Sequence, residues 1–587
     1  MSIFAGVYAR RADQAIPAKL VDELRAAVSR HSDDADTKVQ FSDDRVFIVK
    51  VDIGALGAPG ELFDAERVAV VAGDPILQPS AGATPVDRLE GVRAIAQDLA
   101  AGQLEALQSC RGTYSAAVYE KSSQRLHLIA DKLGVRPVYF WVLPDYIVFA
   151  TALRILEALR SCKKSLKLQG VAEVACFGYP LSDRTPYENI FALYAGEVVT
   201  SDSLDIKRTR YWRWDDLPAP AASDLPAPER LYRLFIDAIG LRLHGQKVAA
   251  AFLSGGLDSR AIVAALRHFG TEVFTANFAA PGSQDQVFGQ LAAEKLGAHY
   301  VPLPMRPLGE GDSHSKISTL EWITSAEYLS HSPQRPQVVW SGDGGSVGLG
   351  HVYLNPDIVA TARAGDLQGA TEKFMAYSTW KFSGKLLKRP LAKTLADLVD
   401  DGIRAELESL HPADPGRLFY LFLMLNDQRR HMAGHFENLD LSRIEFELPF
   451  FDADFVAGIF QEPIDPFLRH VFYIDWLKCF PPGVLEVPWQ AYPNHVPCPL
   501  PKPDGLTYQW DKSAAAEEVK KRLATALGRA KNLLGEPVFS REFLSYQYMR
   551  LFMLLARWGK KDVSYLLIAP SVIYRYWSRT KAAGSEA

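Results

Sequence analysis

The chain has 587 residues, which is enough for roughly two to four domains and for a large buried core. Its residues are 48% hydrophobic and 23% charged, a globular composition that excludes a disordered, collagen-like or coiled-coil chain. The formal charge of −4 argues against nucleic-acid binding through a broad basic face, and no apolar run is long enough to span a membrane.

The five cysteines are scattered, odd in number and form no CxxC pair. This spacing excludes a disulfide framework and a cysteine zinc site, and it predicts a reducing, cytoplasmic compartment. The first residues lack a basic stretch followed by a long apolar one, so no signal peptide is expected.

The first part of the chain, roughly 200 residues, alternates short apolar segments with Gly, Pro, Asp and Ser, which predicts antiparallel sheets. The expected strands are 45–53, 67–71, 114–119, 126–130, 137–143 and 146–150. The expected helices between them include 20–29 and 86–100.

A proline-rich, acidic stretch, DDLPAPAASDLPAPE at 215–229, is typical of an exposed connector. We place a domain boundary just before it, so the predicted domains are 1–205 and 206–587. Beyond it, apolar runs alternate with helical periodicity, which predicts a parallel, doubly wound sheet. The expected strands are 248–253, 273–278, 300–304 and 338–340, and the expected helices are 231–243, 259–269 and 284–296. From about residue 355 the periodicity predicts a mostly helical part.

The sequence SGGLDS, at 254–259, falls where the first parallel strand ends and a helix begins. Glycines there let backbone N–H groups approach an anion, and the helix N-terminus adds positive potential. Ser254 and Ser259 add hydroxyl donors, whereas Asp258 would repel a phosphate unless a magnesium ion lay between them. The Walker A ending GK[ST] is absent. The alternative is a plain strand-to-helix turn that needs two glycines and an Asp cap.

A second glycine-rich turn, SGDGGSVGLG at 341–350, directly follows the expected strand 338–340. Ligands of open α/β sheets bind at the carboxyl ends of the strands, so the two turns are expected at one edge. Asp343 is therefore a candidate for metal binding or base chemistry, the alternative being a flexible loop with a solvated Asp. Asp285, at the start of the next helix, is either part of this site or a favourable charge on the helix dipole.

These motifs resemble the asparagine synthetase superfamily, and the resemblance covers almost the whole chain. SGGLDS is similar to the pyrophosphate-binding loop of ATP pyrophosphatases, and SGDGG at 341–345 stands where the superfamily has SGEGSDE. RIEFELPFFD, at 443–452, resembles GVEARVPFLD and puts the functional glutamate at Glu445. RGTYSAAVYE, DKLGVRPVYF and TPYENIFALYAGE resemble the glutaminase domain. The resemblance implies an α/β protein: a glutaminase-like antiparallel sandwich, then a parallel-sheet ATP-pyrophosphatase domain with a helical C-terminal part.

The departures from the superfamily are as informative as the matches. Its glutaminases begin with Cys-Gly-Ile, whereas the matching residues here are Ala5-Gly6-Val7, and Ala5 cannot attack an amide. The glutamine-holding NGEIYN is replaced by AGDPIL at 72–77. We therefore expect the domain to keep its fold and to have lost ammonia production. The alternative nucleophile is Ser2, if Met1 is removed.

Without ammonia, the nucleophile is an amine of the substrate, as in β-lactam synthetases and lasso peptide cyclases. The length, SGDGGSVGLG and VPWQAYPNHVPCPLP at 487–501 favour a lasso peptide cyclase, which joins a side-chain carboxylate to the N-terminal amine of a leaderless peptide. The alternatives are a small-molecule ATP-dependent amide ligase and a non-catalytic descendant. The resemblance implies ATP and Mg²⁺ as cofactors. As partners it implies a precursor peptide and its leader protease.

The resemblance also assigns site residues. The ATP and pyrophosphate group is Leu253, Ser254, Gly255, Gly256, Asp258, Ser259, Phe278 and Gly342, with Leu253 and Phe278 beside the nucleoside. Asp258 and Asp343 are the magnesium ligands, because Ser346 replaces the second Asp of the superfamily. Asp343, Glu445 and Lys502 are the catalytic candidates, with Lys512 as the next lysine. Trp489, Tyr492 and His495 either shape a peptide channel or pack in the core.

Overall fold

The computed structural model describes residues 1–31, 38–78, 84–202, 205–217, 223–303, 323–508, 516–559 and 561–581. The chain forms two compact units. The first unit contains Met1–Ala158, Leu193–Asp366 and Pro412–Trp510, and the second contains Leu159–Ala192, Leu367–His411 and Asp511–Ala587. Each unit is thus assembled from three segments, and the division at residue 205 stays a prediction.

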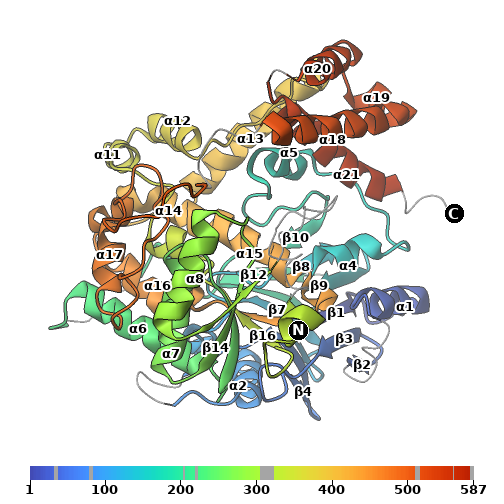
Figure 1. Cartoon of the computed structure of the whole chain (residues 1–587). Helices are drawn as coiled ribbons and strands as arrows, with labels where there is room; N and C mark the ends of the chain where they lie inside the picture. The colour runs from blue at the N-terminus through green and yellow to red at the C-terminus, as the bar shows by residue number, and fades with distance from the viewer. Residues whose placement is uncertain are drawn as a thin grey trace. The chain divides into compact units, whose positions relative to one another are not determined.

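Two antiparallel sheets occupy the N-terminal part of the first unit (Figure 1). One sheet has the neighbouring strands β2 (Lys38–Ser42), β3 (Val46–Asp52), β1 (Ser2–Ala9), β9 (Tyr146–Ala150) and β8 (Tyr139–Val142). The other has β12 (Asp205–Arg210), β11 (Glu197–Asp202), β7 (Arg125–Ala130), β6 (Tyr114–Glu120), β5 (Arg67–Gly73) and β4 (Glu61–Phe63). The predicted antiparallel strands are confirmed.

The two sheets form a sandwich with a helix on each outer face. β1 contacts β5 across the sandwich, α1 (Ala18–Ala27) packs on β1 and β3, and α2 (Arg88–Ala100) packs on β4 and β5. Strands with both faces covered read as continuous apolar runs rather than as alternating ones, and all eight residues of β1 are buried. Two short helices, α3 (Glu105–Ser109) and α4 (Leu153–Ala158), complete this part.

A five-stranded parallel sheet forms the rest of the core of the first unit. Its order is β15 (His299–Pro302), β14 (Glu272–Asn277), β13 (Val248–Phe252), β16 (Val338–Trp340) and β17 (Glu445–Glu447). All neighbours are parallel, which confirms the predicted sheet. The helices α7 (Asp258–His268) and α8 (Gln284–Leu296) contact each other and the sheet (Figure 1). The carboxyl ends of β13, β14 and β16 therefore meet at one edge.

The first unit also contains further helices and helical turns. They are α6 (Ala227–Arg242), α10 (Ala326–Leu329), η2 (Gly345–Leu349), α11 (Pro356–Arg363), η3 (Pro415–Arg417), α14 (Leu418–Phe422), η4 (Leu423–Gln428), α15 (Arg429–Phe436), η5 (Leu439–Leu441), η6 (Pro449–Phe451), α16 (Ala453–Phe460), η7 (Asp465–His470) and α17 (Val471–Leu477). Both η2 and η4 are π-helical turns, which often occur at functional sites.

The second unit is mainly helical, as predicted for the C-terminal part. It contains α5 (Leu168–Phe177), β10 (Ile190–Ala192), α12 (Leu367–Tyr377), α13 (Arg389–Glu408), α18 (Ala516–Gly535), α19 (Pro537–Phe543), α20 (Tyr546–Trp558), η8 (Ser564–Leu567) and α21 (Ile568–Lys581). α5 packs against α13 and α21, and α18 packs against α19, α20 and α21. In the part of the chain that the structure describes, no helix has both the length and the apolar character needed to cross a membrane.

Candidate active site

The two glycine-rich turns pack directly against each other at the edge of the parallel sheet. They follow the neighbouring strands β13 and β16, in which Ala251 is paired with Trp340. A Cβ atom at Gly345 would lie 2.6 Å from Cγ of Asp258, and one at Gly342 would lie 2.6 Å from the backbone nitrogen of Ser259. Because such contacts are shorter than real side chains allow, these glycines are what lets the turns meet.

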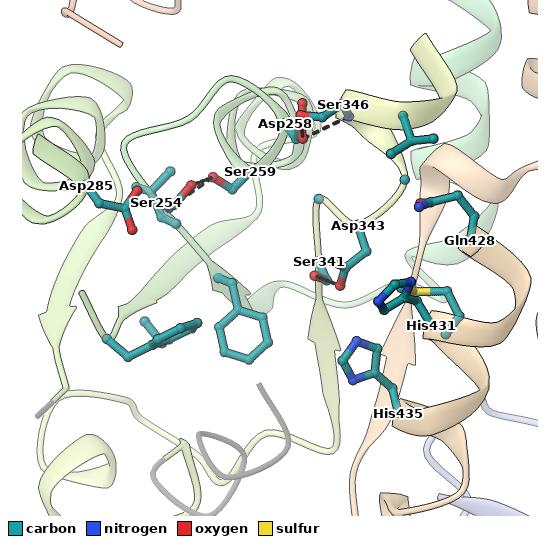
Figure 2. Close-up of a pocket in the computed structure, with 18 of the residues that line it drawn as sticks. Ser254, Asp258, Ser259, Asp285, Ser341, Asp343, Ser346, Gln428, His431 and His435 are labelled. Carbon is teal, nitrogen blue, oxygen red and sulfur yellow. Dashed lines mark hydrogen bonds between the residues drawn. The ribbon is translucent and has the colours of Figure 1, made fainter. Parts of the chain in front are cut away.

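A cavity of about 370 Å³ opens where the turns meet (Figure 2). Most of the predicted binding residues line it: Leu253, Ser254, Asp258, Ser259, Phe278, Gly342 and Asp343. Gly256 lines an adjoining cavity of about 160 Å³. Gly255 belongs to the same turn but lines neither of these two cavities.

The first turn is held by its own hydroxyl groups and by Asp285. The backbone N–H of Ser254 donates to Oγ of Ser259 at 3.0 Å, and that of Gly256 donates to Oγ of Ser254 at 3.1 Å. The N–H of Gly255 donates to Oδ1 of Asp285 at 2.7 Å. Burial raises the pKa of Asp285, and the hydrogen bond from Gly255 offsets only part of this rise. A phosphate that bound this turn would therefore take over donors that now serve hydroxyl and carboxylate oxygens.

Asp258 is oriented by two residues from other elements. Its Oδ1 accepts a hydrogen bond from the Tyr473 hydroxyl at 2.6 Å, and its Oδ2 accepts from the N–H and the hydroxyl of Ser346 at 3.0 and 2.5 Å. Burial, followed by the nearby charge of Asp258, raises the pKa of Tyr473 well above its usual value, so this hydroxyl stays a neutral donor. Ser346 thus positions the carboxylate of Asp258. An aspartate there would place a second negative charge against it.

The donor set at the cavity fits one magnesium ion bound together with phosphates. Asp258 and Asp343 line the same space, and Oδ2 of Asp343 accepts a hydrogen bond from the Ser341 hydroxyl at 2.7 Å. Magnesium in nucleotide sites takes one or two carboxylates and completes its shell with phosphate oxygens and waters. The described residues contain no cluster of three or more His, Cys, Asp and Glu side chains suited to a metal held by protein alone.

Residues from η4 and α15 form a wall of the cavity that the sequence analysis did not predict. They are Asp427, Gln428, His431, Met432 and His435. Nδ1 of His431 lies 3.2 Å from Oδ1 of Asp427 and 3.1 Å from its carbonyl oxygen. Figure 2 shows His431 and His435 on the side of the cavity that faces Asp343. The sequence does contain a pattern that could have indicated this wall. Asp427, His431 and His435 recur every four residues and thus share one helix face.

The charge of His431 depends on the carboxylates around it. Burial lowers the pKa of His431, but the hydrogen bond and charge of Asp427 outweigh this, and Asp343 adds to the effect. The net result is a raised pKa. The imidazole is therefore a stronger proton acceptor than an ordinary histidine.

Two of the predicted catalytic residues do not reach this cavity. Glu445 is buried in β17, where it pairs with Arg136 and accepts a hydrogen bond from the Ser2 hydroxyl at 2.7 Å. Burial raises the pKa of Glu445, but the charge of Arg136 outweighs this and brings the pKa to about 2. Lys502 is exposed and lines neither cavity. Lys512 lies outside the described residues.

The predicted aromatic segment lies beside the first turn. Trp489, Tyr492 and His495 line the adjoining cavity together with His470, and Tyr492 lines both cavities. The His470 ring stacks on Tyr492 with 5.4 Å between centroids and 11° between planes. Burial and the nearby His495 lower the pKa of His470 to about 3, so its ring is neutral. Asp343 does not line this adjoining cavity, whereas Asp258 and Asp285 do.

Of the segments that depart from glutaminases, the one around Ala5 is buried in a sheet and the one that contains Gly73 contacts a buried ion pair. Ala5 is fully buried between Val49 and Ala150 in the sheet. The carbonyl of Gly73, in the segment that replaces NGEIYN, accepts a hydrogen bond from Nε of Arg88 at 2.8 Å. Arg88 also pairs with Asp52 at 2.9 Å. The hydroxyl of Ser2 accepts from the N–H of Gly73 at 2.9 Å and donates to Glu445.

Two family models match the chain. Residues 95–212 match a glutamine amidotransferase domain, and residues 230–306 match asparagine synthase. A putative glutamine-hydrolyzing asparagine synthetase 2 of Methanocaldococcus jannaschii is 25% identical over 169 residues, 28% of this chain and 33% of the relative. The glutamine-hydrolyzing asparagine synthetase 3 of Bacillus subtilis is 27% identical over 176 residues, 29% of this chain and 28% of the relative. The matches thus span about a third or less of these relatives.

Among solved structures, a glutamine phosphoribosylpyrophosphate amidotransferase from B. subtilis shows 10% identity and a TM-score of 0.24. That comparison covers 59% of this chain and 77% of the other, and nothing about function follows from it. The two domain matches and the relatives above show that parts of the chain are similar to glutamine amidotransferase domains and to asparagine synthetases.

Proposed function

We propose that this protein is an ATP-dependent, AMP-forming ligase that closes a macrolactam ring within one peptide, as lasso peptide cyclases do. The proposal rests on two features of the chain that occur together. The SGGLDS turn and Asp258 open onto a cavity, whereas Ala5 stands where glutaminases have their nucleophile. A carboxylate can then be activated by ATP, but the attacking amine comes from the substrate itself.

The turn residues bind and orient ATP. Ser254, Gly255, Gly256 and Ser259 supply donors to the phosphates, and Leu253 and Phe278 flank the nucleoside. Phe278 is held edge-on by Phe252, with 5.8 Å between ring centroids. Magnesium, held by Asp258 and Asp343, would neutralise charge on the phosphates.

The proposed reaction is a condensation within one peptide. An oxygen of a peptide Asp or Glu carboxylate bonds to the α-phosphorus, the bond to the β-phosphate bridge breaks, and pyrophosphate leaves. The N-terminal amine then attacks the acyl carbon, an isopeptide bond forms, and AMP leaves with the carboxylate oxygen. One carboxylate oxygen stays on AMP, and the terminal ammonium group loses one proton before the attack and one during it, so the ring is one water lighter than the peptide. Holding both groups in one site removes much of the entropic barrier.

We assign the acceptance of that proton to His431, with Asp427 as its positioning residue. His431 lies in the cavity wall and its Nδ1 faces Asp427, which leaves the Nε2 side of the ring toward the cavity. Asp343, the acceptor predicted from the sequence, also lines this cavity. Glu445 is a far weaker base, because Arg136 holds its pKa at about 2.

This assignment predicts a pH effect. The base must be neutral, so activity should rise as pH passes upward through the raised pKa of His431. Asp427→Asn removes the charge that raises this pKa and should shift the acidic limb of the kcat profile to lower pH. His431→Asn should lower kcat about 100-fold. His435→Asn, one turn further on, is the matched control and should leave the limb unchanged. An unshifted limb in Asp427→Asn would contradict the assignment.

The proposed reaction is tested by mass spectrometry of a reconstituted mixture. The probe is a set of synthetic peptides with a free N-terminal amine and one Asp or Glu, incubated with Mg-ATP and the full chain. We expect loss of one water from the accepted peptide and one AMP per ring. AMP formation with free amino acids and with no peptide would instead identify a small-molecule amide ligase. Absence of AMP under all conditions would favour a binding protein.

The altered N-terminal domain leads to a separate prediction. Glutamine should not serve as a nitrogen donor, because Ala5 has no nucleophile and the Ser2 hydroxyl is engaged by Glu445 and Gly73. Glutamate release from glutamine should equal the protein-free background in a coupled assay. Enzymatic release that Ser2→Ala abolishes would instead assign the nucleophile to Ser2.

A further inference from the structure

The helix α20 in the second unit carries an apolar stripe on its exposed side. Tyr548, Leu551, Leu555 and Trp558 recur at helical spacing and are exposed to 54%, 50%, 38% and 73%. Leu554 lies beside them and is 55% exposed. The opposite side of the helix is buried through Met549, Phe552 and Ala556. We call these five exposed residues the α20 stripe.

Exposed apolar side chains concentrate in this part of the chain. Nine of the thirteen large hydrophobic side chains that are exposed in the described residues lie between Val538 and Ile568. Single exposed leucines are ordinary, whereas a contiguous exposed apolar face marks a binding surface. This concentration of exposed apolar side chains therefore indicates a surface that binds a partner.

The charge of the segment that contains the α20 stripe indicates which kind of partner binds there. Residues 516–581 hold thirteen Lys and Arg against five Asp and Glu, a formal charge of +8, although the whole chain carries −4. Arg550 and Arg557 are exposed on α20 itself, and Lys561 is exposed just beyond it. The partner should therefore be both apolar and negatively charged.

We propose that the α20 stripe binds the surface of an anionic lipid bilayer. Tyr and Trp rings are favoured at the headgroup level, where one part of the ring is apolar and the other wet. Leucines can enter the acyl boundary while the Arg and Lys heads reach anionic headgroups. A second copy of the chain fits less well, because a symmetric contact would place the basic surface that carries Arg550 and Arg557 against the same basic surface of the other copy.

Vesicle flotation with the full chain tests this proposal. Vesicles of phosphatidylcholine mixed with phosphatidylglycerol should bind the protein at least about tenfold more tightly than vesicles of phosphatidylcholine alone, and added salt should weaken the binding. The joint substitution of Leu554→Gln and Trp558→Gln should weaken it by about tenfold or more. These positions are more than half exposed, so circular dichroism and thermal melting should match the unaltered protein.

A matched control is Phe63→Gln in β4, which removes an exposed aromatic residue of 42% exposure from the other unit and should leave vesicle binding unchanged. Three results would overturn the proposal. One is the absence of binding to the mixed vesicles, and another is equal binding by the altered α20 protein. The third is a concentration-dependent dimer that the same α20 substitutions dissociate, which would assign the stripe to a second copy. The proposal is independent of the cyclase activity, so it can fail while that activity stands.

Discussion

Replacing Asp258 by asparagine should lower AMP formation by about 100- to 1000-fold without unfolding the protein. Asparagine keeps the size of the side chain but has one acceptor oxygen in place of two, so it can accept from Tyr473 or from Ser346 and not from both, and it lacks the charge that a phosphate-bound cation needs. The measurement is the steady-state rate of AMP release, together with a thermal melt to establish that the variant is folded.

Ser346→Ala is the matched control for Asp258→Asn. It keeps the carboxylate of Asp258 and removes only the hydroxyl that holds Oδ2 at 2.5 Å, so we expect a loss of about tenfold. The informative result is which substitution lowers AMP release more, and we expect the larger loss in Asp258→Asn. Asp258→Asn with AMP release close to that of the unaltered protein would exclude a metal-binding role for Asp258.

Asp452→Ala should destabilise the first unit by about 3–5 kcal/mol, because it removes the buried carboxylate that two buried arginines share and also removes a helix cap. Asp452 is fully buried and accepts hydrogen bonds from Arg111 at 3.0 Å and from Arg242 at 2.8 Å. It also caps α16 by accepting from the N–H groups of Asp454 and Phe455, each at 3.1 Å. The expected result is a lower urea midpoint, monitored by tryptophan fluorescence.

The Asp452→Asn variant distinguishes the contribution of the helix cap to stability from that of the ion pairs. Asparagine is a good N-cap, so this variant should lose the ion pairs alone and lie between Asp452→Ala and the unaltered protein. Burial raises the pKa of Asp452, but Arg242 and Arg111 outweigh this and hold it below its usual range. The stabilisation is therefore present above the unfolded pKa of about 3.9 and is lost as pH falls toward the folded value. Unchanged midpoints in both variants would contradict this account.

The sequence predicted the sheet and its loops well because their signals are local. The apolar run at 248–253 became β13, and the glycines of both turns lie where two strand ends meet. β17 was not expected as a strand, because three residues are too few to show a period.

Contacts between distant segments were harder to predict from the sequence. His431 enters the cavity from α15, about 170 residues beyond the SGGLDS turn, so only the fold brings it there. Glu445 was placed in the site by its motif, but it pairs with Arg136, which is more than 300 residues earlier. Lys502 was chosen as the nearest lysine in sequence, and its segment leaves it exposed. The local sequence pattern therefore predicted the two glycine-rich turns. The cavity wall formed by η4 and α15 depends on packing between segments far apart in the sequence, so the local pattern did not predict it.

Transfer of labelled oxygen tests the central claim, activation of a peptide carboxylate as an acyl-adenylate. A peptide that the protein cyclises would carry a heavy oxygen isotope in its Asp or Glu carboxylate. After a single turnover with Mg-ATP, AMP and the cyclic product would be analysed by mass spectrometry. The account predicts one labelled oxygen in AMP for each ring formed. Label in inorganic phosphate with release of ADP, or ring formation with unlabelled AMP, would contradict it.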